Sequence, residues 1–182
     1  MGAEPCSRYY PQLLVAGQAP NRLREPHEGQ VLGLGFTRVR LVLTGADTGG
    51  AFTLSEQPLE PRALAGPLHR HAHEDGFIYV VSGHIGAHVD GQVVGCDPGS
   101  TVLVPRGARH TFWNPTDVPA KVLELFTPAG LEGWFLELAE IVRSEPVSLT
   151  DIVESGRRFG TELDLDSVVP LLTSFDLRLP GI

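Results

Sequence analysis

The chain has 182 residues, of which 42% are hydrophobic and 20% are charged, a composition that favours one compact domain over global disorder. Its formal net charge of −8 argues against general binding to nucleic acids or to anionic membrane surfaces, since both require basic patches. No apolar run reaches membrane-spanning length, and the N-terminus lacks the basic flank and apolar core of a secretory signal.

The first part of the chain predicts an irregular arm followed by strands. Residues 1–30 carry four prolines and few periodic apolar positions, so we expect no regular structure there. A short strand is expected near Leu32–Leu34. Alternating valines and leucines predict a second strand over Thr37–Leu43, and a turn over Gly45–Gly50 leads to a third over Ala51–Glu56. The prolines of Gln57–Gly66 predict a loop.

Short strands at close intervals then dominate the sequence. Asp90-Gly91 between two of them is the strongest hairpin signal in the chain. The expected strands are Leu68–His71, Phe77–Ser82, Ile85–Val89, Gln92–Val94, Thr101–Pro105, His110–Asn114 and Lys121–Phe126. Many short strands separated by Gly and Pro turns predict an all-β sandwich or barrel over residues 31–128.

The apolar period changes to that of helices after residue 129. An amphipathic helix is expected from about Leu131 to Arg143, and Ser148 or Thr150 could cap a second helix that ends near Phe159. Residues 161–182 are ambiguous, with a short helix over Asp166–Ser174 interrupted near Pro170. We therefore expect residues 129–182 to form a helical appendage packed on the outside of the barrel.

Three histidines stand out as candidate metal ligands. His69 and His71 are two residues apart, so on a strand they point to the same face. His110 follows the Pro105-Arg106-Gly107 turn. Imidazole is a common ligand of divalent transition metals, and three such groups on one side of a barrel can hold one ion.

These segments resemble the two sequence motifs of the cupin superfamily. The second motif, Gly-x5-Pro-x-Gly-x2-His-x3-Asn, is matched in full by Gly99, Pro105, Gly107, His110 and Asn114. The first, His-x-His-x4-Glu-x6-Gly, is matched by His69, His71 and Gly83. Over roughly residues 35–140 the sequence is similar to small bacterial single-domain cupins related to quercetin 2,3-dioxygenases. The resemblance implies a double-stranded β-helix (cupin or jelly-roll barrel) with C-terminal helices, and a metal held by His69, His71 and His110.

One position departs from the family pattern, because Gly76 stands where the family places a glutamate ligand. Three consequences are open. The ion is held by the three histidines alone, or His73, Glu74 or Asp75 bends in as an extra ligand, or the site binds no metal. Of these three residues, His73 extends the alternating histidine series, so we take it as the candidate for the extra ligand.

An apolar wall is expected beside the ion. Ile78, Val80, Val102, Val104 and Phe112 share the ligands' side of their strands, and ligand sites are mostly apolar with a few placed polar groups. None of these side chains transfers protons, so the metal would supply most of the polarisation. Three neutral imidazoles leave the ion's double charge intact, which favours an anionic chelating ligand.

The expected function is a metal-dependent dioxygenase of a small aromatic, polyketide-like or diketone substrate. Iron is the preferred metal, with nickel, manganese, copper or zinc as alternatives. Two other hypotheses stay open: a non-oxidative cyclase or isomerase of a polyketide-type pathway, and a binding barrel without catalysis.

The remaining expectations concern the cellular location, the oligomeric state and the other polar side chains. Cys6 and Cys96 are expected to be independent thiols, which makes a cytoplasmic location the default. A homodimer is expected, because a barrel with exposed edge strands has reason to pair. His84 and His88 are expected on a polar outer face, and Asn114 is expected to bond backbone groups across the barrel.

Overall fold

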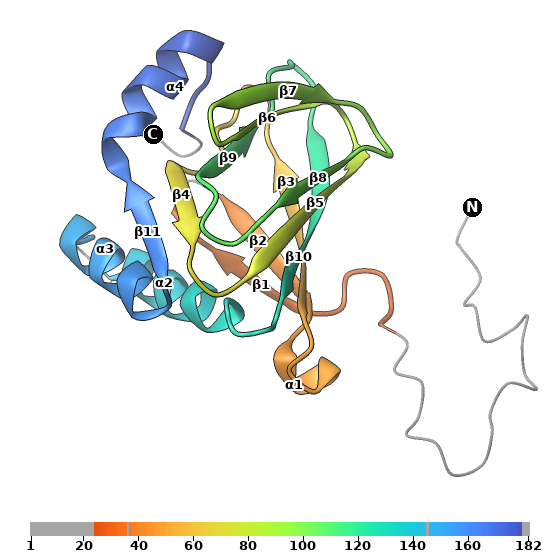
Figure 1. Cartoon of the computed structure of the whole chain (residues 1–182), viewed down its shortest axis with the longest axis vertical. Coiled ribbons are helices and arrows are strands. Elements are labelled where there is room, and N and C mark those ends of the chain that lie inside the picture. The colour runs from red at the N-terminus through yellow and green to blue at the C-terminus, as the bar shows by residue number, and fades with distance from the viewer. Residues whose placement is uncertain (1–23, 36, 145, 180–182) are drawn as a thin grey trace, which may run out of the picture.

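Two antiparallel sheets face each other in the computed structural model, which describes residues 24–35, 37–144 and 146–179. One sheet has the strand order β1-β2-β3-β10-β5-β8 and the other β11-β4-β9-β6-β7 (Figure 1). The strands are β1 (Gln30–Gly33), β2 (Arg38–Leu43), β3 (Thr53–Leu59), β4 (Leu68–His71), β5 (Asp75–Ser82), β6 (Ile85–Val89), β7 (Gln92–Cys96), β8 (Thr101–Val104), β9 (His110–Trp113), β10 (Ala120–Thr127) and β11 (Thr161–Asp164). The predicted all-β double-stranded β-helix with C-terminal helices is confirmed.

Alternation of side chains along the strands separates the barrel interior from its surface. In β10 the residues at even positions, from Ala120 to Phe126, are buried, and those between them are only partly covered. β3 pairs with β10 in antiparallel register and has the same alternation. Since neighbouring residues of a strand point to opposite faces, this pattern directs Val122, Glu124 and Phe126 into the barrel.

Apolar side chains fill much of the barrel interior. A single buried cluster joins residues from both sheets, including Ile78, Val80, Val104 and Phe112, with Val102 packed against it. The buried amide of Asn114 donates to the carbonyl oxygens of Glu60 and Val118, at 3.0 and 2.7 Å. Asn114 therefore ties backbone segments together, as predicted.

Helices follow the barrel and cover one side of it. They are α2 (Glu132–Arg143), α3 (Leu149–Arg158), the 3-10 helix η2 (Leu165–Ser167) and α4 (Val168–Phe175); a one-turn helix, α1 (Gly45–Thr48), lies within the predicted turn. The hydroxyl oxygen of Ser148 accepts from the backbone N–H of Asp151, which makes Ser148 the cap of α3. The described helices include none long and apolar enough to cross a membrane.

The C-terminal segment differs from its prediction in two ways. Residues 161–164 form β11, which pairs with β4 and adds an edge strand to the barrel sheet. α4 is not interrupted at Pro170, because this proline lies in its first turn, where the missing N–H would have no helical partner. α4 also brings Phe175 onto Trp113, with ring centroids 4.2 Å apart, so Trp113 packs within the chain.

Part of the predicted N-terminal arm and one of the two cysteines lie outside the described residues. Of residues 1–30, the structure describes only 24–30, and Gln30 already begins β1. Cys6 is among the residues that are not described. Cys96 is buried and forms no disulfide among the described residues.

Candidate metal centre

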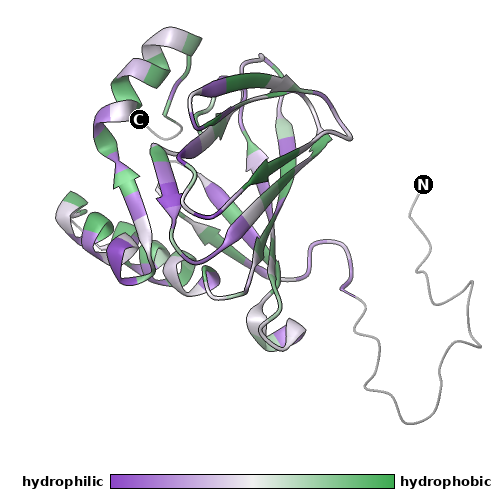
Figure 2. Ribbon diagram, viewed as in Figure 1, coloured by the Kyte–Doolittle hydropathy of each residue, from purple (hydrophilic) through white to green (hydrophobic). Residues whose placement is uncertain are grey.

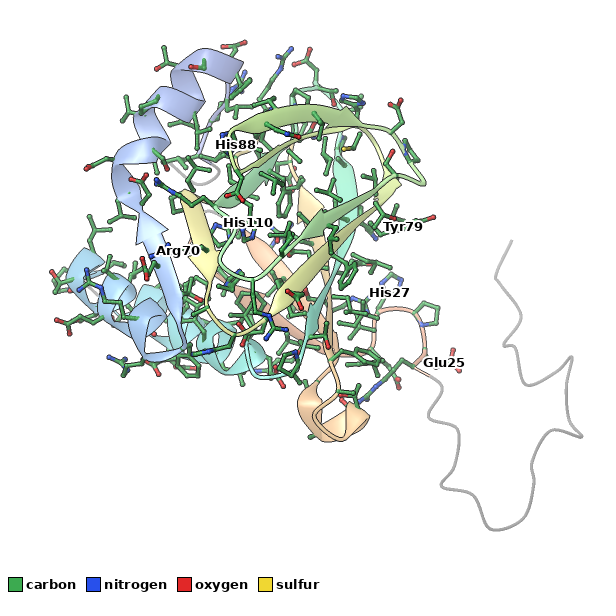
Figure 3. The ribbon with its side chains drawn as sticks, viewed as in Figure 1. Glu25, His27, Arg70, Tyr79, His88 and His110 are labelled. Atoms are coloured by element: carbon green, nitrogen blue, oxygen red, sulfur yellow. The ribbon has the colours of Figure 1, made fainter. Side chains whose placement is uncertain are left out.

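The three predicted ligands meet inside the barrel because of strand register. His69 and His71 point inward from β4, whereas Arg70 between them points outward to Glu162. This run of polar residues gives β4 its hydrophilic colour in Figure 2. His110 is the first residue of β9 and is the direct cross-strand partner of His69. Figure 3 shows His110 between the two sheets and Arg70 on the outside of β4.

The geometry of the three imidazoles suits a single ion. One ring nitrogen from each of His69, His71 and His110 lies within 4.8 Å of the other two. His71 and His110 are buried, and His69 is half-buried. Ring centroids are 4.2 Å apart for the His69–His110 pair and 5.0 Å apart for the His69–His71 pair. An ion with metal–nitrogen distances of about 2.0–2.1 Å would hold these nitrogens about 3–4 Å apart, so small side-chain adjustments would suffice.

Each imidazole is anchored through its Nδ1 atom. Nδ1 of His69 lies 2.9 Å from the carbonyl oxygen of Pro67, and Nδ1 of His110 lies 3.1 Å from that of Ala108. Because a carbonyl only accepts, each Nδ1 must carry the proton and donate it. Nδ1 of His71 lies 2.9 Å from the hydroxyl oxygen of Thr161 on β11. For His69 and His110 this arrangement leaves the Nε2 lone pair available to a metal, as in known histidine–metal sites, and the Thr161 hydroxyl can accept from Nδ1 of His71 in the same way.

Burial keeps these imidazoles neutral. Removal from water lowers the pKa of His69 and lowers that of His71 well below its usual value. It lowers the pKa of His110 to about 3, with a smaller contribution from the neighbouring His69. Neutral imidazole is the form that binds metals, so the donor set fits a divalent transition metal.

The residues proposed as an extra ligand take other positions. Within the described part of the chain, the group able to hold an ion consists of the three histidines and includes neither His73, Glu74 nor Asp75. The carboxylate of Asp75 pairs with Arg106 at 2.7 Å, and this hydrogen-bonded guanidinium lowers the pKa of Asp75 to about 2. The ring of His73 rests on Gly160, where a Cβ atom would come within 2.5 Å of it.

Gly76 lies beside the histidines and faces inward. It is buried on β5 and alternates with inward Ile78 and Val80. Its cross-strand neighbours are Val104 and Phe126, and the ring of Phe126 lies 5.6 Å from that of His71. A Cβ atom at position 76 would lie 3.7 Å from the Phe126 ring, which is an ordinary contact.

A cavity of about 290 Å³ opens next to the histidines. It lies between the barrel and the helices α2 and α3, and most of its wall is apolar. The residues that line it include His69, His71, Phe112, Phe126, Trp134, Phe135, Leu138, Ile152 and Leu163.

The position of this cavity corrects the predicted substrate wall. Phe112 lines the cavity, as expected, but Ile78, Val80, Val102 and Val104 do not. These four share the inward face of their strands with the site, yet they pack in a buried apolar cluster of the barrel interior and do not line the cavity. The helices supply the wall in their place, and no strand pattern indicates which helical residues reach the site.

Besides the histidines, three polar residues in the described part of the chain line the cavity, and the sequence analysis placed none of them in the site. They are Glu124 on β10, Gln57 on β3 and Thr37, which precedes β2. Burial raises the pKa of Glu124 to about 8. The expectation that no proton-transferring side chain lies in the pocket was therefore wrong. The sequence did contain a sign of this, because Glu124 alternates with the apolar residues Val122 and Phe126. It therefore lies on the face of its strand that is buried.

The other histidines form no second metal group among the described residues. Nδ1 of His84 lies 2.8 Å from a carboxylate oxygen of Asp97 on the surface. His88 is half-buried on β6 and its Nδ1 has no hydrogen-bond partner in the described part of the chain. Tyr79 points away from the barrel interior (Figure 3).

Comparison with known sequences identifies one family and one curated relative. Residues 55–126 match the family model described as the cupin domain. The tetracenomycin polyketide synthase protein TcmJ of Streptomyces glaucescens is 32% identical over 60 residues, which cover 33% of this chain and 40% of TcmJ. The match thus spans less than half of that relative's length.

Several solved structures align with part of this chain. KdgF from Halomonas sp. aligns over 59% of this chain and 91% of its own, with 21% identity and a TM-score of 0.48. An RmlC-like cupin from Shewanella frigidimarina aligns over 58% and 89%, with 18% identity and a TM-score of 0.49. A mutant of the salicylate 1,2-dioxygenase from Pseudoaminobacter salicylatoxidans aligns over 43% and 23%, with 30% identity and a TM-score of 0.40.

Proposed function

This chain is a cupin-superfamily protein, and from that premise we propose that it is a metal-dependent dioxygenase of a small aromatic, polyketide-like or diketone substrate. The observation that carries the proposal is the convergence of three neutral imidazoles, each anchored through Nδ1, at the wall of an apolar cavity. The relation to quercetin 2,3-dioxygenases is part of the proposal.

His69, His71 and His110 would hold the metal through their Nε2 atoms. A divalent ion bound there would supply a Lewis acid for a chelating oxygen pair and, if it is iron, a site for oxygen. Iron is the preferred metal in this proposal, with nickel, manganese, copper or zinc as alternatives, since three imidazoles do not by themselves select one.

The cavity supports an apolar, chelating substrate. Its volume of about 290 Å³ is near the lower end of the size usual for small-molecule sites. The rings of Phe126 and Trp134 lie near His71, with centroids 5.6 and 6.5 Å from it. A flat molecule with an enol–ketone or catechol edge would place this edge toward the histidines and its rings against these aromatic side chains.

A non-oxidative cyclase or isomerase is the second candidate, and two observations favour it. The curated relative TcmJ is described as a polyketide synthase protein. The cavity also contains Glu124, a buried carboxyl that acid–base chemistry could use. In this candidate the same metal would polarise a carbonyl without any use of oxygen.

Both enzyme candidates require a bound metal, and metal analysis of protein purified without an affinity tag tests this requirement. We expect close to one equivalent of a divalent transition metal per chain, or uptake at micromolar or better affinity. His110→Ala should abolish this binding, whereas His84→Ala, a surface histidine outside the cluster, should retain it. Absence of metal together with absence of uptake would leave only a binding barrel without metal chemistry.

Oxygen consumption separates the two enzyme candidates. The iron-loaded protein, given flavonols, catechols and β-diketones in turn, should consume oxygen with its substrate if it is a dioxygenase. Conversion of one of these compounds at an undiminished rate in oxygen-free buffer would instead support the cyclase or isomerase.

A further inference from the structure

Glu124 is a buried acid without a partner in the part of the chain that the structure describes. It is buried on the inward face of β10 and lines the cavity beside His69 and His71. Among the described residues, none forms a hydrogen bond or ion pair with its carboxyl group. Buried carboxyl groups are normally hydrogen-bonded, because an unpaired one is costly. A group that enters the cavity would supply the missing partner.

The residues next to Glu124 extend this polar area. Ser55 is its direct cross-strand partner on β3, and the buried Ser55 hydroxyl also lacks a partner in the described part of the chain. Gln57 lies two residues further along β3. Its amide nitrogen donates to the hydroxyl of Thr37 at 2.8 Å, which leaves the Gln57 carbonyl oxygen available to the cavity. Within the described part of the chain, the Glu124 carboxyl group and the Gln57 carbonyl oxygen therefore offer unused hydrogen-bonding capacity on an otherwise apolar wall, and Ser55 adjoins them without lining the cavity.

Glu124 does not belong to the metal centre. The carboxyl group is not part of the set of donor atoms that lie within 4.8 Å of one another. Burial is also the sole cause of the raised pKa of Glu124, without any contribution from the charge of a histidine. Glu124 is thus placed to meet the substrate rather than the ion.

We propose that Glu124 is a catalytic residue that accepts the hydroxyl proton of an enol or phenol substrate, in a polar subsite shared with Gln57. This inference rests on the proposed function, since the same substrate would chelate the metal. In the step, the substrate O–H bond breaks and an O–H bond forms on the Glu124 carboxylate. The negative charge moves from Glu124 to the substrate, which becomes an enolate or phenolate. The step is a proton transfer only, so nothing is oxidised or reduced.

The environment of Glu124 suits this role. A pKa of about 8 leaves both the acid and the carboxylate populated near neutral pH, as proton transfer in either direction requires. In an isomerase the acid would return the proton to a carbon of the enolate. In a dioxygenase the same transfer would prepare the anion. The subsite therefore selects substrates that carry a chelating oxygen pair and an acidic hydroxyl.

Zinc-loaded protein and 3-hydroxyflavone provide a test that does not depend on turnover, because zinc has no redox role. Glu124→Gln keeps the shape of the side chain but cannot accept the proton, and Glu140→Gln on the exposed face of α2 is the matched control. Zinc affinity should be the same in all three proteins. The affinity of Glu124→Gln for 3-hydroxyflavone should fall about tenfold or more, and the absorption band of the deprotonated flavonol should weaken. At about pH 9, where Glu124 of the free protein is mostly carboxylate, infrared difference spectra should show a new carboxylic-acid band when the flavonol binds to wild type, and none in Glu124→Gln.

The measurements distinguish a failure of the proposed function from a failure of the role given to Glu124. No zinc uptake by wild type would overturn the proposed function and this inference with it. Zinc uptake with identical flavonol spectra in wild type and Glu124→Gln would overturn the inference alone. Loss of zinc from Glu124→Gln would make Glu124 a metal ligand and would also overturn it. Glu124→Asp retains a carboxyl group, so restored proton transfer in this variant would support the inference even if Glu124→Gln were poorly folded.

Discussion

Thr161 holds His71 from a strand that lies ninety positions away along the chain: the Thr161 hydroxyl oxygen is 2.9 Å from Nδ1 of His71. The two residues are direct partners in the β11–β4 ladder, and both are buried. The C-terminal segment thus orients a ligand of the candidate metal centre.

Thr161→Val is expected to weaken metal binding by about 10- to 100-fold, the usual effect of losing a group that orients a metal ligand. Valine keeps the shape but removes the hydroxyl partner of the buried His71 Nδ1, which should also lower the free energy of unfolding by about 1–3 kcal/mol. Thr161→Ser keeps the hydroxyl and should bind nearly as wild type. Calorimetric titration with zinc gives the affinities, and equal values for the valine variant and wild type would exclude the role given to Thr161.

Gly76→Glu is expected to tighten metal binding, because position 76 faces the interior beside the histidines. The first atom of the new side chain fits, since a Cβ atom there would lie 3.5 Å from Val104 and 3.7 Å from the Phe126 ring. It would lower the net charge of the site by one and so weaken the binding of anionic chelators. Gly76→Ala is the control for added bulk. A zinc affinity of Gly76→Glu no higher than that of Gly76→Ala would show that position 76 does not reach the ion.

Phe112→Leu is expected to weaken the binding of flavonols or diketones without release of the metal. Phe112 is the one member of the predicted wall that lines the cavity. Loss of about 40 Å² of apolar contact would cost about 1 kcal/mol, or about fivefold in affinity. Val102→Ala, outside the cavity, should leave the affinity unchanged. The shifted absorption band of the metal-bound chelator reports both values, and a panel in which small polar acids or thiols bind instead would refute the apolar-substrate proposal.

The stability of the metal-free protein should depend on pH through Glu124. Its folded-state pKa is about 8, whereas its ordinary value is 4.5. The folded state therefore keeps a proton that the unfolded state has lost, and the free energy of unfolding should fall as pH rises from about 4.5 to about 8. This contribution to the free energy of unfolding is fully present below the unfolded-state pKa of 4.5 and is lost as the pH rises past the folded-state pKa of about 8. Its upper limit is about 5 kcal/mol.

Glu124→Gln should remove this pH dependence, because glutamine does not titrate. Urea unfolding at pH 5 and pH 8.5 measures the difference for both proteins. The difference should be larger for wild type than for Glu124→Gln. The same pH dependence in both would mean that Glu124 is ionised in the folded protein at neutral pH.

The sequence by itself determined the parts of this protein that depend on local patterns. The limits of β4 and β6 were predicted correctly, because Pro and Gly turns bound short alternating segments. The pairing of histidines at positions 69 and 71 follows from strand geometry alone. Their meeting with His110 was expected from the resemblance of both segments to known motifs.

The tertiary structure decided the rest, since it depends on contacts between distant segments. No pattern in residues 161–164 specifies that they pair with β4 and place Thr161 on His71. The same reason explains the cavity. Residues of α2 and α3 line it because of how these helices dock on the barrel, while the inward valines of β5 and β8 pack in the buried core and do not reach it. Glu124 became a candidate for proton transfer only when docking of the helices enclosed it, because enclosure is what removes water from its carboxyl group and raises its pKa.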